Sequence, residues 1–400
     1  MALNAEKIRQ DFPILAKRFN NKLIIYFDSA CMTLKPQSVL DAMSEYYTDY
    51  TACVGRSAHK LGRTATEKYA EARAKIAKFI GAKPEEIVFT RNTTESINLV
   101  AHCTDFKSGD VVLTTDKEHN SNLLPWQLLK EKGIKHKICY SKSDGTFDIE
   151  NFKKSFPARL VSMVHTSNVD GTTIPAKEII KIAHDNKSLV LLDAAQSVPH
   201  KKTDVKKIDA DFIAFSGHKM LGPTGIGVLY GKYELLEKLK PFMVGGNTVK
   251  NTTYTEHEFL KPPEIFEAGL QNYAGAIGFS AAADYLQKIG MENIESHEIE
   301  LNKIISNNIS EIPGLKILGP NPELRSGIIS FLIDKMDIHY IAQMLDKTEN
   351  IAVRSGQHCV HSWFNAHKLP GSIRASLYLY NTKDEARIFV ETLKKIAQLR

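Results

Sequence analysis

Short apolar runs alternate with stretches of helical periodicity across about the first 260 residues of this 400-residue chain. The helical stretches Thr64–Ile80, followed by Gly81, and Ala176–Asn186 each place apolar residues on one face. The apolar runs that predict strands are Leu23–Phe27, Glu86–Thr90, Asp110–Thr114, Leu160–His165, Leu189–Leu192, Asp211–Phe215 and Gly227–Tyr230. Such alternation is typical of an α/β fold, in which helices cover both faces of a mostly parallel sheet.

The pattern changes after about residue 260. Two long helices are predicted over Gly275–Lys288 and Asn293–Ile309, and the segments after them mix strands with helices. The predicted strands here are Gly327–Leu332, Ile351–Arg354 and Gly371–Leu379, and the predicted helices are Ile338–Leu345 and Asp384–Gln398. We therefore expect a smaller α+β domain appended to the larger α/β domain.

Composition excludes several other classes of protein. Hydrophobic residues make up 43% of the chain and charged residues 24%, a balance that excludes disordered and collagen-like chains. The net charge of +6 is spread along the chain without a polybasic run, so we do not expect nucleic-acid binding. No apolar run reaches about 18 residues, so we expect no transmembrane helix and no membrane partner.

The cysteines indicate the redox compartment. There are five of them, far apart and without a CxxC pair: Cys31, Cys53, Cys103, Cys139 and Cys359. The first residues are amphipathic and charged and lack the apolar core of a signal peptide. We expect a reduced, cytoplasmic compartment, in which a special cysteine acts through its thiol.

A predicted strand leads into a glycine-dense turn that holds Ser216, Gly217, His218 and Lys219 in a row. A lysine at the end of a buried strand is partly desolvated, which lowers the pKa of its amine and makes it available as a Schiff-base nucleophile. The preceding apolar run ends in Asp193, whose carboxylate needs a partner. That partner is either a helix N-terminus or the protonated pyridine nitrogen of pyridoxal phosphate.

Two further strand ends carry polar side chains. Asn92 and Glu95 form the pattern of a capping box at the start of a helix, and Thr93 and Thr94 add two hydroxyls there. Because a helix N-terminus favours anions, this turn is also a candidate phosphate site. His119 follows another predicted strand and is either a surface or hydrogen-bonded core residue, or a side chain that stacks on a cofactor ring.

The last informative segment surrounds Cys359, which lies among a glycine turn, an arginine and two imidazoles, a setting that favours a reactive thiol. His358, Cys359, His361 and His367 are alternatively zinc ligands, although their spacing is unusual for a tetrahedral site. Arg374 follows a predicted strand start and suits a bidentate grip on a substrate carboxylate.

From Tyr26 to Thr382 the chain resembles the group II (Suf-type) cysteine desulfurases, also called selenocysteine lyase-like, within the class V aminotransferases. This resemblance rests on several short stretches. They are Asn92-Thr-Thr-Glu-Ser-Ile-Asn-Leu-Val, Glu118-His119, Pro125-Trp126, His165-Thr-Ser-Asn168, Asp193-Ala-Ala-Gln-Ser-Val-Pro-His, Phe215-Ser-Gly-His-Lys, Gly222-Pro-Thr-Gly-Ile-Gly-Val-Leu-Tyr, Phe266-Glu-Ala-Gly, Arg374-Ala-Ser and Tyr380-Asn-Thr. The segment Ser-Gly-His-Lys with its upstream Asp-Ala-Ala-Gln is the most specific of them.

The resemblance implies a pyridoxal 5'-phosphate (PLP)-dependent transferase of fold type I with a seven-stranded, mostly parallel sheet. The implied cofactor-binding residues are Thr93, Thr94, His119, Asp193, Gln196, Ser216, His218 and Lys219. The implied catalytic residues are Lys219 as the Schiff-base lysine, His119 stacked on the ring and Cys359 as the sulfur acceptor. Asn168 and Arg374 are implied to bind the substrate carboxylate, and no metal is implied.

The implied reaction converts L-cysteine to L-alanine through a persulfide on Cys359, for iron–sulfur cluster assembly or other sulfur transfer. Implied partners are L-cysteine or L-selenocysteine, a second copy in a homodimer and a sulfur-acceptor protein such as a Suf-type scaffold or carrier. The implied domains are an N-terminal segment (1–20) packed on the small domain, a PLP-binding large domain (21–265), and an interdomain helix with a small domain that carries the Cys359 loop (266–400).

Three alternatives stay open at this point: a selenocysteine lyase, another PLP enzyme such as an epimerase or aminotransferase, and a non-catalytic scaffold. The chain also departs from the usual pattern of the family. Leu270 replaces a threonine that reaches the neighbouring subunit's phosphate, Gly55 replaces a histidine, and Gln357 replaces a histidine near the thiol. Asp28-Ser-Ala-Cys-Met-Thr stands where Ala-Ala-Thr-Thr is common.

Overall fold

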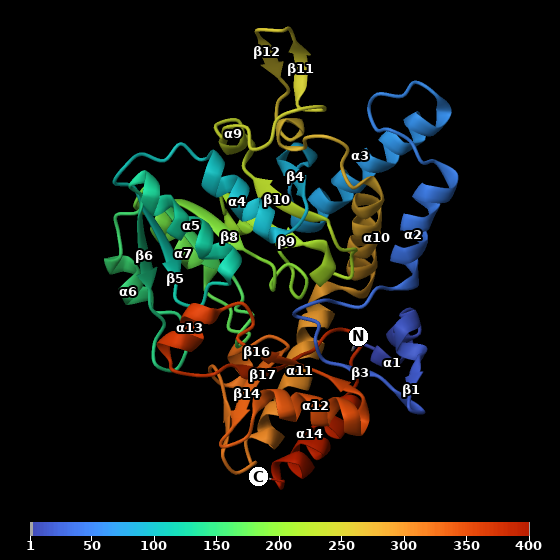
Figure 1. Cartoon of the computed structure of the whole chain (residues 1–400), viewed down its shortest axis with the longest axis vertical. Coiled ribbons are helices and arrows are strands. Elements are labelled where there is room, and N and C mark those ends of the chain that lie inside the picture. The colour runs from blue at the N-terminus through green and yellow to red at the C-terminus, as the bar shows by residue number, and fades with distance from the viewer. Residues whose placement is uncertain (1–2, 400) are drawn as a thin grey trace.

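The computed structural model describes residues 3–399 of the chain. Its larger part is built on a seven-stranded sheet and its smaller part on a four-stranded sheet. In Figure 1 the larger part lies above the smaller part. The α/β fold class with a smaller C-terminal mixed part is therefore confirmed. The domain boundaries at residues 20 and 265 stay predictions.

The large sheet is mostly parallel. Its strands are β4 (Ile87–Thr90), β5 (Val111–Thr115), β6 (Lys135–Cys139), β7 (Leu160–Val164), β8 (Leu189–Asp193), β9 (Phe212–Ser216) and β10 (Gly227–Gly231). They lie in the order β4-β10-β9-β8-β7-β5-β6. The run from β9 to β6 is parallel, whereas β10 is antiparallel to both of its neighbours, β9 and β4.

One predicted strand belongs elsewhere. The expected strand Leu23–Phe27 contains β3 (Ile25–Tyr26), which pairs with β15 (Ile351–Ala352) and not with the large sheet. The remaining place in the large sheet is taken by β6, at its edge. This strand has the polar sequence Lys-His-Lys-Ile-Cys and is mostly exposed, so an analysis based on apolar runs does not find it.

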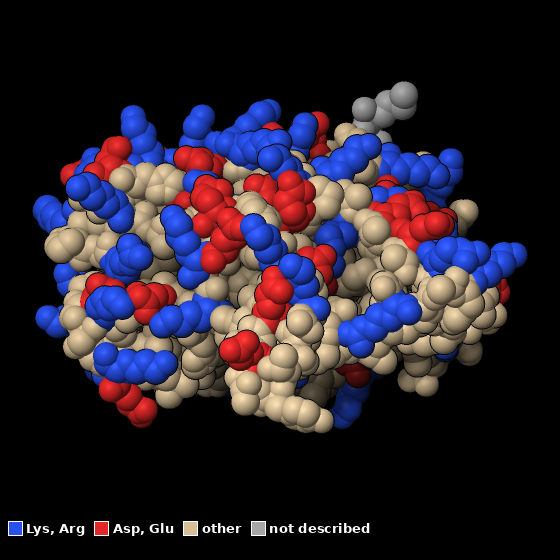
Figure 2. Space-filling view, turned by 90° about the horizontal axis from the view of Figure 1, so that it is seen from above, with Lys and Arg blue, Asp and Glu red and all other residues tan. Residues whose placement is uncertain are grey.

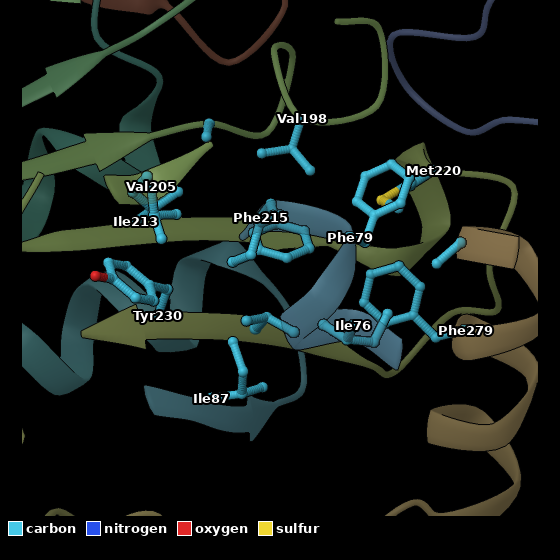
Figure 3. Packing of buried hydrophobic residues seen from close by; sticks show 14 of the residues in the cluster. Ile76, Phe79, Ile87, Val198, Val205, Ile213, Phe215, Met220, Tyr230 and Phe279 are labelled. Atoms are coloured by element: carbon cyan, nitrogen blue, oxygen red, sulfur yellow. The ribbon is translucent and has the colours of Figure 1, made fainter. Parts of the chain in front are cut away.

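Side chains on the central strands alternate between two buried clusters, as the period of a strand requires. In β9, Ile213 and Phe215 belong to one cluster, and Phe212 and Ala214 to the other. Figure 3 shows the first cluster, in which the rings of Phe215 and Phe279 lie edge to face with centroids 6.0 Å apart. Both faces of the sheet are therefore covered.

Helices cover these faces. The first face is covered by α2 (Gln37–Asp49), α3 (Lys60–Ile80), α7 (Ala176–Asp185) and α10 (Tyr273–Ile289), and the second by α4 (Thr93–Cys103) and α5 (Leu124–Leu128). Helix α3 begins four residues before the predicted start because the His59 ring caps it, accepting the N–H of Gly62 at 3.2 Å. It ends as predicted, with Gly81 in the left-handed conformation at a φ of 76°.

The smaller part has its own core. Its strands are β13 (Leu315–Ile317), β14 (Ile328–Ile333), β16 (Arg354–Gly356) and β17 (Ser372–Ser376), in the antiparallel order β13-β14-β17-β16. Its helices are α11 (Met291–Ile309), α12 (Ile338–Glu349) and α14 (Lys383–Ala397). The N-terminal helix α1 (Ala5–Arg9) contacts α14, where Arg9 and Glu385 form an ion pair of 2.6 Å.

Shorter elements lie in the connections. They are β1 (Arg18–Phe19), β2 (Lys22–Leu23), α6 (Ile149–Lys154), α8 (Val205–Ile208), α9 (Tyr233–Leu236), β11 (Val249–Thr252), β12 (His257–Phe259) and α13 (His361–Ala366). The β11–β12 hairpin projects from the larger part in Figure 1. The face seen in Figure 2 mixes both signs of charge, and among residues 3–399 no helix combines the length and apolar character needed to cross a bilayer.

Candidate active site

A cavity of about 290 Å³ is lined by every residue to which the family resemblance assigns a catalytic, cofactor-binding or substrate-binding role. These residues are Thr93, Thr94, His119, Asn168, Asp193, Gln196, Ser216, His218, Lys219, Cys359 and Arg374. Most of them follow the carboxyl ends of strands in the large sheet, where an α/β fold gathers its ligand-binding loops. A larger hollow of about 750 Å³ beside the start of α14 contains none of them.

Lys219 and Asp193 form the charged centre of the cavity. Asp193 ends β8, is almost fully buried and accepts the N–H of Ala195 at 3.0 Å. This hydrogen bond lies within a turn and is not a helix cap. A buried carboxylate also needs a positively charged partner, which this N–H group does not supply. Burial raises the pKa of Asp193, and the Lys219 ammonium opposes this rise. Burial likewise lowers the pKa of Lys219, which favours a neutral amine.

The N-terminus of α4 forms a polar cradle on the cavity wall. Asn92 caps the helix by accepting the N–H of Glu95 at 3.0 Å, but the Glu95 carboxylate accepts the N–H of Arg91 and so completes only part of the predicted capping box. The N–H of Thr93 donates to Ser216 Oγ at 2.8 Å, and the two hydroxyls are 2.6 Å apart. Helix dipole, N–H groups and hydroxyls together suit an anion such as phosphate.

This cradle depends on Gly227 at the start of β10. A Cβ atom placed on Gly227 lies only 2.6 Å from the Cα atom of Asn92. Because the Asn92 atoms that this Cβ would meet are backbone and cannot rotate away, the start of α4 has its position only when residue 227 has no side chain. The glycines of the segment therefore bring two pieces of backbone together.

His119 is held as a neutral ring. Its Nδ1 accepts the N–H of Ser121 at 3.1 Å, and the Ser121 hydroxyl lies 2.7 Å from that of Thr94. Burial lowers the pKa of His119 to about 3, and the positive charge of Lys219 adds to this effect. The preceding Glu118 anchors the loop by accepting the N–H of Val164 at 3.0 Å. The ring is thus uncharged near neutral pH.

Four buried polar atoms of residues that line the cavity lack a hydrogen-bond partner within residues 3–399. They are Asn168 Oδ1, Gln196 Oε1, His358 Nδ1 and Arg374 Nε. The other atoms of these groups are well anchored, since Asn168 Nδ2 donates to the carbonyl of His358 at 2.8 Å and Arg374 Nη1 to the carbonyl of Asn168 at 3.0 Å. Leaving a buried polar atom unpaired costs about 1–3 kcal/mol, so this donor and acceptor set is arranged for a polar ligand.

Cys359 reaches the cavity from the smaller part of the molecule. His358 and Cys359 both have left-handed backbone, with φ values of 50° and 59°, an arrangement that is strained for two consecutive residues other than glycine. The carbonyl of Cys359 accepts the N–H of Asn120 at 2.8 Å, which ties the thiol loop to the loop that carries His119. The two parts of the chain therefore meet at the thiol.

The zinc alternative finds no matching geometry. His358 Nε2 contacts the hydroxyl of Ser372 at 2.8 Å, and His361 Nδ1 lies 3.0 Å from Asn120 Nδ2. Within the described part of the chain, no three His, Cys, Asp or Glu side chains gather closely enough to hold a metal ion.

The structure adds cavity residues that the sequence analysis does not assign. Cys31 and Arg354 both line the cavity, and Arg354 Nη1 donates to Cys31 Sγ at 2.6 Å. Their sequence separation of more than 300 residues hides this contact. The signal that was available is the unusual Asp28-Ser-Ala-Cys-Met-Thr segment, whose cysteine stands where the related pattern has a small or hydroxyl residue.

Comparison with known proteins places the chain in a family. The family model described as aminotransferase class-V matches residues 25–389. The chain belongs to the class-V aminotransferases. A probable cysteine desulfurase of Synechocystis sp. is 43% identical over 98% of this chain and 95% of that protein. A probable cysteine desulfurase of Halalkalibacterium halodurans is 42% identical over 98% of both chains.

Solved structures agree with this assignment to the class-V aminotransferases. The apo cysteine desulfurase of Thermococcus onnurineus has a TM-score of 0.95 and 39% identity, covering 100% of this chain and 99% of that one. The Escherichia coli cysteine desulfurase CsdA, in an S-sulfonic acid form, has a TM-score of 0.92 and 32% identity, covering 100% of both chains. The resemblance found in the sequence is thereby confirmed.

Proposed function

We propose that this class-V aminotransferase is a PLP-dependent cysteine desulfurase, which converts L-cysteine to L-alanine and passes the sulfur to Cys359. The observation that carries the proposal is the meeting of Lys219, the buried carboxylate of Asp193 and the Cys359 thiol around one cavity. The relatives named above support the choice of reaction. A transaminase or an epimerase has no need of a thiol at this place.

The residues of the cavity fit PLP. Asp193 supplies a buried carboxylate for a protonated pyridine nitrogen. The unpaired Gln196 Oε1 can accept a hydrogen bond from a donor of the bound ligand. The remaining implied contacts are the ring stacking of His119 and the phosphate contacts of Thr93, Thr94, Ser216 and His218. When bound, PLP supplies an electron sink for negative charge that develops at the substrate Cα atom.

Lys219 has two roles in this proposal. Its amine, whose pKa is lowered by burial, would hold the cofactor covalently and, once free, would accept the proton from the substrate Cα atom. Arg374 and Asn168 would bind the substrate carboxylate, as the family resemblance implies. The unpaired Nε of Arg374 is free to donate to it, and Asn168 holds the guanidinium in place because its backbone carbonyl accepts Arg374 Nη1 at 3.0 Å. These two residues orient the Cα–H bond toward the lysine.

Cys359 removes the sulfur. Its Sγ attacks the sulfur of the bound substrate, the bond between that sulfur and the substrate Cβ breaks, and the electron pair stays with the amino-acid fragment. Proton uptake by that fragment gives alanine, and the enzyme keeps a persulfide on Cys359. A sulfur-acceptor protein would then take the sulfur for iron–sulfur cluster assembly or another sulfur-transfer pathway.

The test is to incubate the PLP-loaded protein with L-cysteine and a reductant and to measure alanine and sulfide together. We expect equal amounts of the two, and we expect Cys359→Ser to lower both at least about 100-fold, as loss of a nucleophile does. Cys53→Ser is the matched control, because Cys53 is also half-buried but does not line the cavity. Alanine without sulfide, or a fully active Cys359→Ser variant, would contradict the proposal.

A further inference from the structure

The five thiols of the chain differ sharply in their surroundings. Cys103 and Cys139 are buried, and burial raises the pKa of each to about 12, so they stay protonated and unreactive. Cys53 is half-buried, and its thiol donates to the carbonyl of its neighbour, Val54, at 3.8 Å. Cys31 and Cys359 are half-buried and line the same cavity. The cavity thus holds a second thiol besides the proposed sulfur acceptor.

Cys31 lies on a tightly anchored turn. Its N–H donates to the carbonyl of Asp28 at 3.1 Å. The neighbouring Ala30 is held on both sides, because its N–H donates to Ser376 Oγ at 3.0 Å and its carbonyl accepts the side chain of Gln196 at 2.6 Å. These contacts join the turn to β17 and to the loop that follows β8, so the backbone that carries Cys31 has a fixed place at the cavity wall.

The Cys31 sulfur is also held by a cation. Arg354 Nη1 donates to it at 2.6 Å, and Arg354 precedes Cys359 by five residues, so one segment supplies both the guanidinium and the other thiol. Arg374, fully buried, adds a second positive charge to the same cavity and has an unpaired Nε atom. Two arginines of the cavity therefore lie where a sulfur that carries negative charge during its transfer needs a cationic partner.

We propose that Cys31 is a second sulfur-accepting residue, which takes the outer sulfur of the Cys359 persulfide. In this step the Cys31 thiolate attacks the outer sulfur, a new bond forms between the two sulfurs, and the bond to Cys359 Sγ breaks. Its electron pair leaves with Cys359 as a thiolate, and the persulfide proton stays with the transferred sulfur. No oxidant is needed, and Cys359 is free to react with a second L-cysteine.

This inference rests on the proposed desulfurase activity, and its test separates the two. The PLP-loaded protein is mixed with two equivalents of ³⁴S-labelled L-cysteine per subunit without reductant and alkylated at successive times. Peptides containing Cys31, Cys53 and Cys359 are then quantified by mass spectrometry. We expect labelled sulfur first on Cys359 and later on Cys31, with none on Cys53.

Variants sharpen the result. We expect Cys359→Ser to carry no label on Cys31. We expect Cys31→Ala to hold half as much labelled sulfur per subunit as the unchanged protein. In Arg354→Gln, we expect label to appear on Cys31 more slowly relative to Cys359. Label on Cys359 with Cys31 unlabelled at every time would overturn the inference and leave the proposed function standing. Label on Cys31 in the Cys359→Ser variant would overturn the transfer route. Absence of both alanine and label would instead refute the proposed function.

Discussion

Burial changes the protonation of three single residues in the cavity, Lys219, Asp193 and His119, in ways that suit them to bind a ligand. Burial disfavours charge on Lys219, Asp193 and His119 alike, and it lowers the pKa of His119 to about 3, so this ring is neutral near neutral pH. Lys219 and Asp193 each partly relieve the other, and a covalent bond at the amine would remove that relief from the carboxylate. A cationic ring nitrogen would then restore a partner to Asp193, which explains why the two groups belong to one site.

Arg374→Lys tests the proposed grip on the substrate carboxylate. Lysine keeps the charge but loses the planar fork, so we expect kcat/KM for L-cysteine to fall about 10- to 100-fold, mainly through a higher KM. Steady-state kinetics measure this, with Arg387→Lys on the exposed surface as the control. An unchanged KM together with a lower kcat would contradict a binding role.

His165 makes the fold sensitive to acid. It is buried, its Nδ1 lies 2.9 Å from Ser197 Oγ, and burial lowers its pKa to about 3 from 6.5. Between these two pH values the unfolded chain binds a proton that the folded chain does not, so the contribution of His165 to stability is full above pH 6.5 and is lost as the pH falls towards 3. When the pH is lowered from 7 to 5, the unfolding free energy of the unchanged protein should fall. We expect this fall to be about 2 kcal/mol smaller in His165→Asn, which has no imidazole to protonate at this position.

Urea unfolding at the two pH values measures this difference. Equal losses in the two proteins would show that His165 is protonated in the folded state.

At the scale of elements, the site depends on how closely β10 approaches the start of α4. Gly227 pairs with both Thr90 of β4 and Ser216 of β9, so the glycine lies between two strands that end at the cavity. The same approach brings Thr93 to Ser216. Packing of one strand against one helix start thus builds the proposed phosphate cradle.

Gly227→Ala tests this packing. The added Cβ meets backbone at 2.6 Å, so α4 must shift, and we expect a loss of about 1–3 kcal/mol in unfolding free energy and weaker retention of PLP. Thermal unfolding and the absorbance of bound PLP after dialysis measure the two effects. Gly246→Ala is the control, since its added Cβ meets nothing closer than 3.8 Å. Equal PLP retention in the two variants would contradict the role of Gly227.

At the scale of the whole molecule, one edge of the larger part exposes apolar side chains that a monomer rarely leaves in water. Met243, Val244 and Leu270 are 43%, 63% and 72% exposed. The segments that carry them are joined where the N–H of Gly269 donates to the carbonyl of Gly246 at 2.7 Å. Such a patch favours the homodimer that the family resemblance implies.

Sedimentation equilibrium tests the dimer. We expect a mass near twice the 44.8 kDa of the chain, and we expect Val244→Glu to shift the mass towards that of one chain. Leu124→Glu, which alters an exposed leucine of α5 away from this edge, is expected to leave the dimer intact. A monomeric unchanged protein would contradict the prediction.

The alternation of apolar runs and helical periods determined the α/β class, because strands buried on both faces and amphipathic helices each impose their own period on the sequence. The segments around Asp193, Lys219 and Cys359 likewise pointed to the site, and the family resemblance added residues such as Asn168 and Gln196 that also line the cavity. Such signals are readable in the sequence because the polar residues of the site lie in short segments directly after apolar strands.

Long-range pairing was decided only in the tertiary structure. The edge strand β6 carries polar residues because one side faces water, and β3 pairs with β15 because those backbones meet after the chain returns across the molecule. The contact between Cys31 and Arg354 arises in the same way. No local period encodes which distant segment becomes a neighbour, since that choice depends on how the two cores pack as wholes.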